Sequence, residues 1–131
     1  MKRTVLILAV TLVLGILLGA IGGEVVAQMK RATLLRTDLA SAEGMEVILQ
    51  LVDLEPGVTG KTHYHPGEEI VYLLEGSLFL GLEKKPDVTM EPGDAFYMLP
   101  GQVHFGKTTT EAAKALVFLV HPKGQPITVA Q

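Results

Sequence analysis

After residue 44 the chain is a series of short apolar segments separated by proline and glycine. Most of these segments are shorter than the ten to twelve or so residues that a helix usually needs, and none has a helical period. Closely spaced β-type segments with Pro and Gly turns are typical of a sandwich or barrel. We therefore expect an all-β domain at 45–131, with strands at 45–54, 61–65, 69–74, 77–83, 88–90, 95–99, 103–107 and 114–120.

The segment before this domain is more polar and less regular. Residues 28–44 mix charged, small and apolar side chains without a clear alternation. We interpret them as an N-terminal arm that contributes one edge strand around Thr33–Leu35.

The first 27 residues have the layout of a secretory signal peptide. Lys2 and Arg3 precede an apolar stretch without charge at 4–23, and the small-residue pattern Val25-Val26-Ala27 follows. The apolar stretch is also just long enough to span a bilayer, so an uncleaved membrane anchor is the alternative. Both interpretations predict export, to the periplasm or the medium or on a membrane, with membrane contact only through this segment.

Composition excludes several classes of function. The net charge is −3, and arginine occurs only at Arg3, Arg31 and Arg36. No basic stripe marks a nucleic-acid surface, so we expect no nucleic-acid partner. The chain has no cysteine, which excludes disulfides and thiolate ligands.

Three of the four histidines fall in two short segments that also contain a suitable carboxylate. His63 and His65 are two residues apart, so on a strand they share a face. A turn at Pro66-Gly67 lets Glu69 return beside them, and His104 must come from another strand. Three imidazoles and one carboxylate suit one divalent first-row transition metal with coordination positions left open. The sequence leaves Fe, Mn, Ni, Cu and Zn as alternatives.

Two neighbouring glutamates compete for the role of carboxylate ligand. Glu69 is in phase with Val71 and Leu73, whereas Glu68 points to the opposite face. We assign Glu69 to the metal and Glu68 to the solvated rim.

These segments resemble the two motifs of the cupin family. The first motif is matched by Gly57, His63, His65, Glu69 and Gly76, and the second by Gly93, Gly101 and His104. The second motif departs in two places, with its proline at Pro100, one position late, and Thr108 where the family has asparagine. The resemblance covers about 45–121 and implies a small single-domain cupin of the cupin 2 type, folded as a jelly-roll barrel (a double-stranded β-helix). It also implies a homodimer, formed by packed sheet edges or by exchange of an N-terminal arm at 29–40.

Other residues are weaker candidates for the surroundings of the metal. The second-shell or cavity candidates are Gln50, Lys61, Tyr97, Gln102 and Thr108. We interpret His121, at the end of the last expected strand, as a surface residue.

The expected cavity lining is apolar, with Val71, Leu73, Val117, Leu119 and Phe96 or Tyr97. No arginine follows Arg36, so the sequence disfavours substrates that need an arginine clamp, such as oxalate or nucleotide-sugars. A small neutral or phenolic ligand fits better.

Three functions remain open at this stage. The first is a dioxygenase-like oxidoreductase, and the second is a non-enzymatic metal or small-ligand binding protein of the cell envelope. The third is a metal-assisted lyase or isomerase, which needs an inward general base such as Tyr97 or Lys61. No catalytic residue is assigned.

Overall fold

The computed structural model describes residues 27–131, which form ten β-strands. The expected signal peptide or anchor at 1–27 therefore lies outside the described residues, apart from Ala27. Within the described range, no helix is long and apolar enough to cross a membrane.

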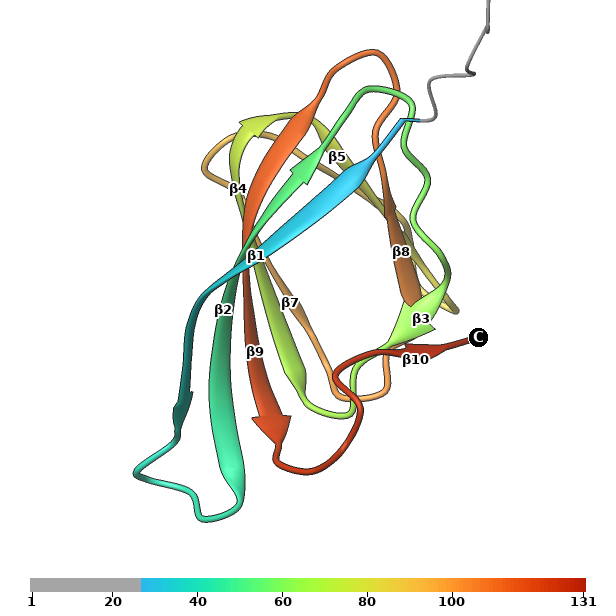
Figure 1. Cartoon of the computed structure of the whole chain (residues 1–131). Helices are drawn as coiled ribbons and strands as arrows, with labels where there is room; N and C mark the ends of the chain where they lie inside the picture. Colours follow the sequence, from blue (N-terminus) through green and yellow to red (C-terminus); the bar gives the residue numbers. More distant parts are fainter. Residues whose placement is uncertain (1–26) are drawn as a thin grey trace, which may run out of the picture.

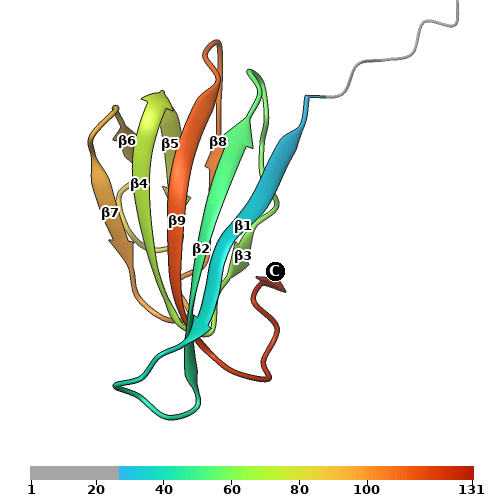
Figure 2. The same cartoon turned by 60° about the vertical axis from the view of Figure 1, so that its left-hand side comes forward.

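The strands form two five-stranded sheets that face each other (Figures 1 and 2). All strand pairs are antiparallel, so the expected jelly roll is confirmed. The first sheet contains, in order, β1 (Met29–Asp38), β2 (Met45–Leu54), β9 (Ala113–Pro122), β4 (Glu68–Gly76) and β7 (Ala95–Met98). The second contains β10 (Val129–Ala130), β3 (His63–Tyr64), β8 (His104–Lys107), β5 (Leu78–Leu82) and β6 (Val88–Met90).

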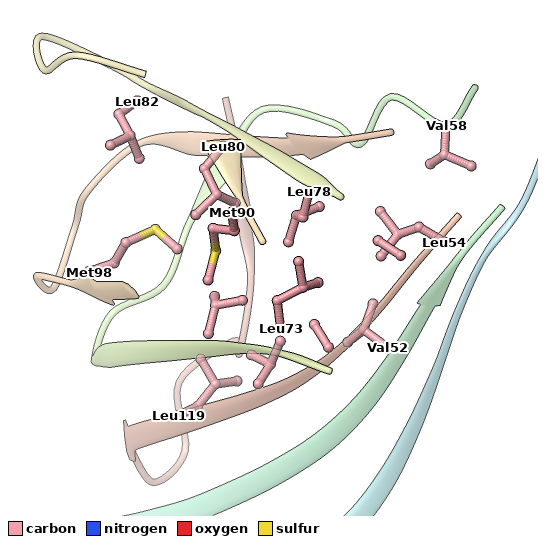
Figure 3. Packing of buried hydrophobic residues seen from close by; sticks show 14 of the residues in the cluster. Val52, Leu54, Val58, Leu73, Leu78, Leu80, Leu82, Met90, Met98 and Leu119 are labelled. Carbon is pink, nitrogen blue, oxygen red and sulfur yellow. The ribbon is translucent and has the colours of Figure 1, made fainter. Parts of the chain in front are cut away.

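The core lies between the sheets and follows the alternation along each strand. In Figure 3, Val52, Leu73 and Leu119 of the first sheet point toward Leu78 and Leu80 of the second. Each of these side chains is almost fully buried. Burial of one such side chain stabilises the fold by about 1.5–3 kcal/mol. The packed core thus fixes the spacing of the two sheets, and with it the position of every inward-facing polar group.

The N-terminal arm departs most from the sequence prediction. We expected a strand only around Thr33–Leu35, but β1 pairs with β2 over ten residues, with a bulge between Thr33 and Leu35. Residues 30–38 are all exposed, so their sequence has no burial pattern. The free edge of β2 supplies the backbone hydrogen bonds that order the arm. The short β10, which pairs with β3, was also not predicted.

His121 is a second correction. Its side chain is only 1% exposed, and its Nε2 lies 2.9 Å from the carbonyl oxygen of Gln125. The inward phase of Val117 and Leu119 continues to His121, because β9 extends through Pro122. The prediction of a surface histidine was therefore wrong.

Two glycines of the sequence motifs differ in what surrounds them, and this allows a stability prediction. Gly76 and Gly93 both have positive φ, at 81° and 93°. A Cβ on Gly76 would overlap the backbone of Ala112, whereas a Cβ on Gly93 would meet nothing within 4 Å. We expect Gly93→Ala to lower the free energy of unfolding by about 1 kcal/mol through φ alone, and Gly76→Ala by about 2–4 kcal/mol. Denaturant unfolding measures both, and equal losses would contradict the close contact at Gly76.

Candidate metal centre

The three predicted histidines come together on the second sheet. His63 of β3 pairs directly with His104 of β8, and His65 follows His63 at the end of β3. The ring centroids of His63 and His104 are 4.4 Å apart. One ring nitrogen of each histidine lies within 4.8 Å of the other two, as a shared metal ion requires.

Glu69 reaches the same point from the first sheet. It is buried, and its Oε2 lies 3.0 Å from Nε2 of His65 and 3.1 Å from Nε2 of His104. The side chain has the inward phase of Val71 and Leu73, and the half-buried Glu68 is out of phase with it. The site therefore joins two sheets, with three imidazoles on one and a carboxylate on the other.

Backbone carbonyls determine which ring nitrogen each histidine presents. Nδ1 lies 2.7 Å from Lys61 O in His63, 2.6 Å from Ile127 O in His65 and 2.8 Å from Gln102 O in His104. A carbonyl oxygen only accepts, so each Nδ1–H donates. In the neutral ring the Nε2 of each histidine then carries a lone pair. This tautomer, fixed by a hydrogen bond at the other nitrogen, is the one that metal-binding histidines use.

The cluster without a cation is electrostatically unbalanced. Glu69 Oε2 is buried, and in the neutral tautomer the Nε2 atoms of His65 and His104 beside it carry no hydrogen, so this oxygen has no donor. A buried carboxylate oxygen without a donor costs free energy. A cation among the imidazole nitrogens and this oxygen would remove the imbalance. The donor set therefore fits a divalent transition metal, with nitrogen and oxygen ligands that do not by themselves select one ion.

The protonation equilibria agree with this interpretation. Burial alone would raise the pKa of Glu69, but the nearby His104 and His65 outweigh burial and lower that pKa to about 2. Burial lowers the pKa of His63, despite its hydrogen bond to Lys61. Burial also opposes a charge on His104, but Glu69 outweighs it and raises the pKa of His104. The carboxylate is thus ionised at neutral pH and attracts positive charge, which a metal would supply in place of a proton.

A cavity of about 250 Å³ adjoins the cluster and includes His63, Glu69 and His104 in its wall. Most of the remaining wall is apolar, as the sequence predicted for Val71 and Val117. Leu73, Leu119, Phe96 and Tyr97, which were also expected there, do not line it. The apolar side chains that do line it are Met29, Val52, Leu54, Val71, Leu78, Leu80, Ala115, Val117 and Ala130.

Two cationic side chains also line this cavity, Arg31 and Lys61. Lys61 was a candidate, but Arg31 was missed, because we expected no arginine in the strands around the cavity. Arg31 pairs with Val52 across β1 and β2, and therefore shares its inward phase. The sequence held no signal for this, because the register of β1 on β2 is not apparent from an exposed segment.

The other four candidates lie elsewhere. Tyr97 is 53% exposed on the outer face of the first sheet, and Gln50, although in phase with Val52, does not line the cavity. The Gln102 side chain donates to the backbone carbonyls of Glu83 and Val103, while the backbone carbonyl of Gln102 accepts from Nδ1 of His104. Thr108 is buried and holds the loop after β2, accepting from Val58 N and donating to Glu55 O.

The contrast between Glu69 and Glu68 gives a direct test of the ligand set. We expect Glu69→Gln to weaken metal binding about tenfold or more, because it removes the one negative charge in the cluster. Glu68→Gln is the matched control and should leave the affinity unchanged, since its side chain is out of phase with the cluster. Titration with Zn²⁺ or Mn²⁺ followed by calorimetry measures both variants. Equal affinity in the wild type and in Glu69→Gln would remove Glu69 from the site.

Comparison with known proteins agrees with the fold and the motifs. Residues 50–121 match the family model described as a cupin domain. The TcmJ protein of the tetracenomycin polyketide synthase from Streptomyces glaucescens is 29% identical over 93 residues. The match covers 70% of this chain but 60% of that relative, so the chain spans only about three fifths of its length.

Solved structures show the same fold. The DMSP lyase DddQ from Ruegeria pomeroyi is 26% identical, with a TM-score of 0.61 over 65% of this chain and 43% of that one. A cupin-like protein from Thermotoga maritima is 22% identical, with a TM-score of 0.64 over 79% of this chain and 75% of that one. On the family match, which covers more than half of the sequence and contains all four predicted ligands, this chain belongs to the cupin family.

Proposed function

We propose that this chain is an exported, metal-dependent enzyme that converts a small organic molecule in the cavity between the two sheets. The observation that carries the proposal is the position of the cluster in the cavity wall. His63, Glu69 and His104 take part both in the cluster and in the lining. A ligand in the cavity would therefore lie against the metal.

The chain itself would bind and orient the substrate. A divalent metal held by the three histidines and Glu69 supplies Lewis-acid or redox chemistry at its remaining positions. The apolar walls from Val52, Val71 and Val117 would bind the hydrocarbon part of the substrate and exclude water from the metal. At about 250 Å³ the cavity is smaller than the roughly 300–1,000 Å³ of pockets for drug-sized ligands. A small apolar or aromatic body fits best.

Among reaction classes, a dioxygenase-like oxidation is our first proposal. Of the two general bases considered from the sequence, Tyr97 lies on the outer surface, and Lys61 is exposed at the cavity. A chemistry that the metal performs without a protein base therefore has the better support. A metal-assisted lyase or isomerase is second, supported by Lys61 in the cavity wall and by the similarity to the lyase DddQ.

The two reaction classes differ in their need for oxygen. Protein loaded separately with Fe²⁺, Mn²⁺, Ni²⁺, Cu²⁺ and Zn²⁺ should be given a panel of small phenols and aromatic acids in an oxygen electrode. We expect oxygen uptake that matches product formation and disappears under argon. Turnover that continues under argon would replace the oxidation with a lyase or isomerase reaction. Binding without turnover, seen as thermal stabilisation only, would show a non-enzymatic binding protein of the cell envelope.

We also propose that the protein is a homodimer, joined through the outer face of the first sheet. Ile70 of β4 lies between Phe118 of β9 and Tyr97 of β7. The three side chains are 41%, 38% and 53% exposed. With Tyr72, Leu74 and Leu99 they form one exposed apolar patch, which we call the outer apolar face. Such an exposed apolar patch suits a second copy of itself, related by a two-fold axis. The arm at 29–40, proposed from the sequence as an exchanged segment, pairs with β2 of its own chain.

Light scattering during size-exclusion chromatography tests the dimer. We expect residues 28–131 to elute as a dimer at micromolar concentration, and Ile70→Lys with Phe118→Lys to give a monomer with an unchanged circular dichroism spectrum. Leu34→Lys is the control, because Leu34 is 55% exposed but lies on β1, which β2 separates from the strands of the patch. A wild-type monomer, or a double variant that stays dimeric, would rule out this interface.

A further inference from the structure

The wall of the cavity contains more cationic than acidic side chains. Arg31 and Lys61 are its cationic lining residues, and Glu69, held in the histidine cluster, is its one acidic lining residue. Both residues are exposed, so water reaches them in the free protein. The two cations therefore line a largely apolar cavity, whose one carboxylate is already held in the histidine cluster.

Neither cation is used in an ion pair within residues 27–131. The four pairs formed by lysine or arginine there are Arg36–Glu46, Lys84–Glu83, Lys114–Asp53 and Lys123–Asp38. The guanidinium of Arg31 has a contact of 3.4 Å to the sulfur of Met29, which is a weak acceptor. Its strand neighbour Arg36, in contrast, is held by two hydrogen bonds to Glu46. Of the two arginines of β1, Arg36 thus donates to a carboxylate and Arg31 does not.

The backbone brings the two cations to one side of the opening. Gly60 N donates to Gly106 O at 2.8 Å, and the end of the Met29 side chain packs against Gly60. The start of β1 therefore lies against the segment that carries Lys61. Lys61 is in turn tied to the metal centre, since its carbonyl accepts from Nδ1 of His63.

We propose that the substrate of this cavity is a small organic carboxylate, whose anionic group is bound by Arg31 and Lys61 while its apolar body extends toward the histidine cluster. This inference rests on the proposed function and specifies its substrate class. Arginine binds a carboxylate through two parallel hydrogen bonds, and such charged pairs are the strong ones. The apolar walls of the cavity suit the hydrocarbon part, and the two cations favour an anionic ligand over the neutral ligand expected from the sequence.

A matched pair of ligands tests the inference on the metal-loaded full chain. Benzoate and benzamide have nearly the same shape, and only benzoate is charged. We expect wild-type protein to bind benzoate about tenfold or more tightly than benzamide, and Arg31→Gln to abolish this preference. Lys61→Gln should reduce it in part. Lys30→Gln is the charge-matched control, because the exposed Lys30 neighbours Arg31 on β1 in the opposite phase.

Three results would overturn the inference. They are equal binding of benzoate and benzamide to the wild type, unchanged benzoate affinity in Arg31→Gln, and tighter binding of inorganic phosphate than of benzoate, which would indicate a phosphate site. Metal content, measured on the same samples, separates this outcome from failure of the proposed function. If the protein takes up no metal but its preference for benzoate is still lost in Arg31→Gln, the anion site is supported and the proposed metal-dependent function is contradicted.

Discussion

The candidate metal centre depends on three backbone carbonyls, because they fix the orientation of its imidazole rings. The carbonyls of Lys61, Ile127 and Gln102 accept from the Nδ1 atoms of His63, His65 and His104. Each ring is thereby turned so that its Nε2 lone pair faces the cluster. The carbonyls belong to loops and strand ends whose positions depend on the jelly roll. The orientation of the three imidazole rings therefore depends on the fold.

The carboxylate completes the cluster from the opposite sheet. Glu69 belongs to β4, between Val71 and the turn at Pro66-Gly67, while His63 and His104 lie on β3 and β8. Its burial without a hydrogen-bond donor destabilises the metal-free fold. A metal would thus be coordinated by side chains of both sheets and would hold the two sheets together at this point. The cavity beside the cluster inherits its shape from the same packing, since Val52, Leu78 and Val117 belong to both the core and the lining.

The sequence was most informative where a strict period applied. The two-residue spacing of His63 and His65 and the phase of Glu69 with Val71 correctly brought these side chains together, because side-chain direction alternates along any strand. The bounds of β2 and β6 were also predicted, since Pro and Gly mark their ends.

Prediction failed where side-chain direction depends on a partner strand. Arg31 lines the cavity because β1 pairs with β2 in one register, which an exposed segment does not reveal. Tyr97 could not be assigned to a face, because the segment around it is apolar at successive positions. Thr108 bonds two backbone groups of a single loop that is about fifty residues distant in the chain, and no local pattern indicates such a contact.

The central claim is that a metal ion is bound by the three Nε2 atoms together with Glu69. Anomalous diffraction from crystals of the metal-loaded protein, collected above and below the absorption edge of the metal, tests it most directly. We predict one strong peak within about 2.0–2.2 Å of Nε2 of His63, His65 and His104 and of a Glu69 oxygen. A peak elsewhere, coordination through Nδ1, or no peak in crystals grown with excess metal would contradict this account.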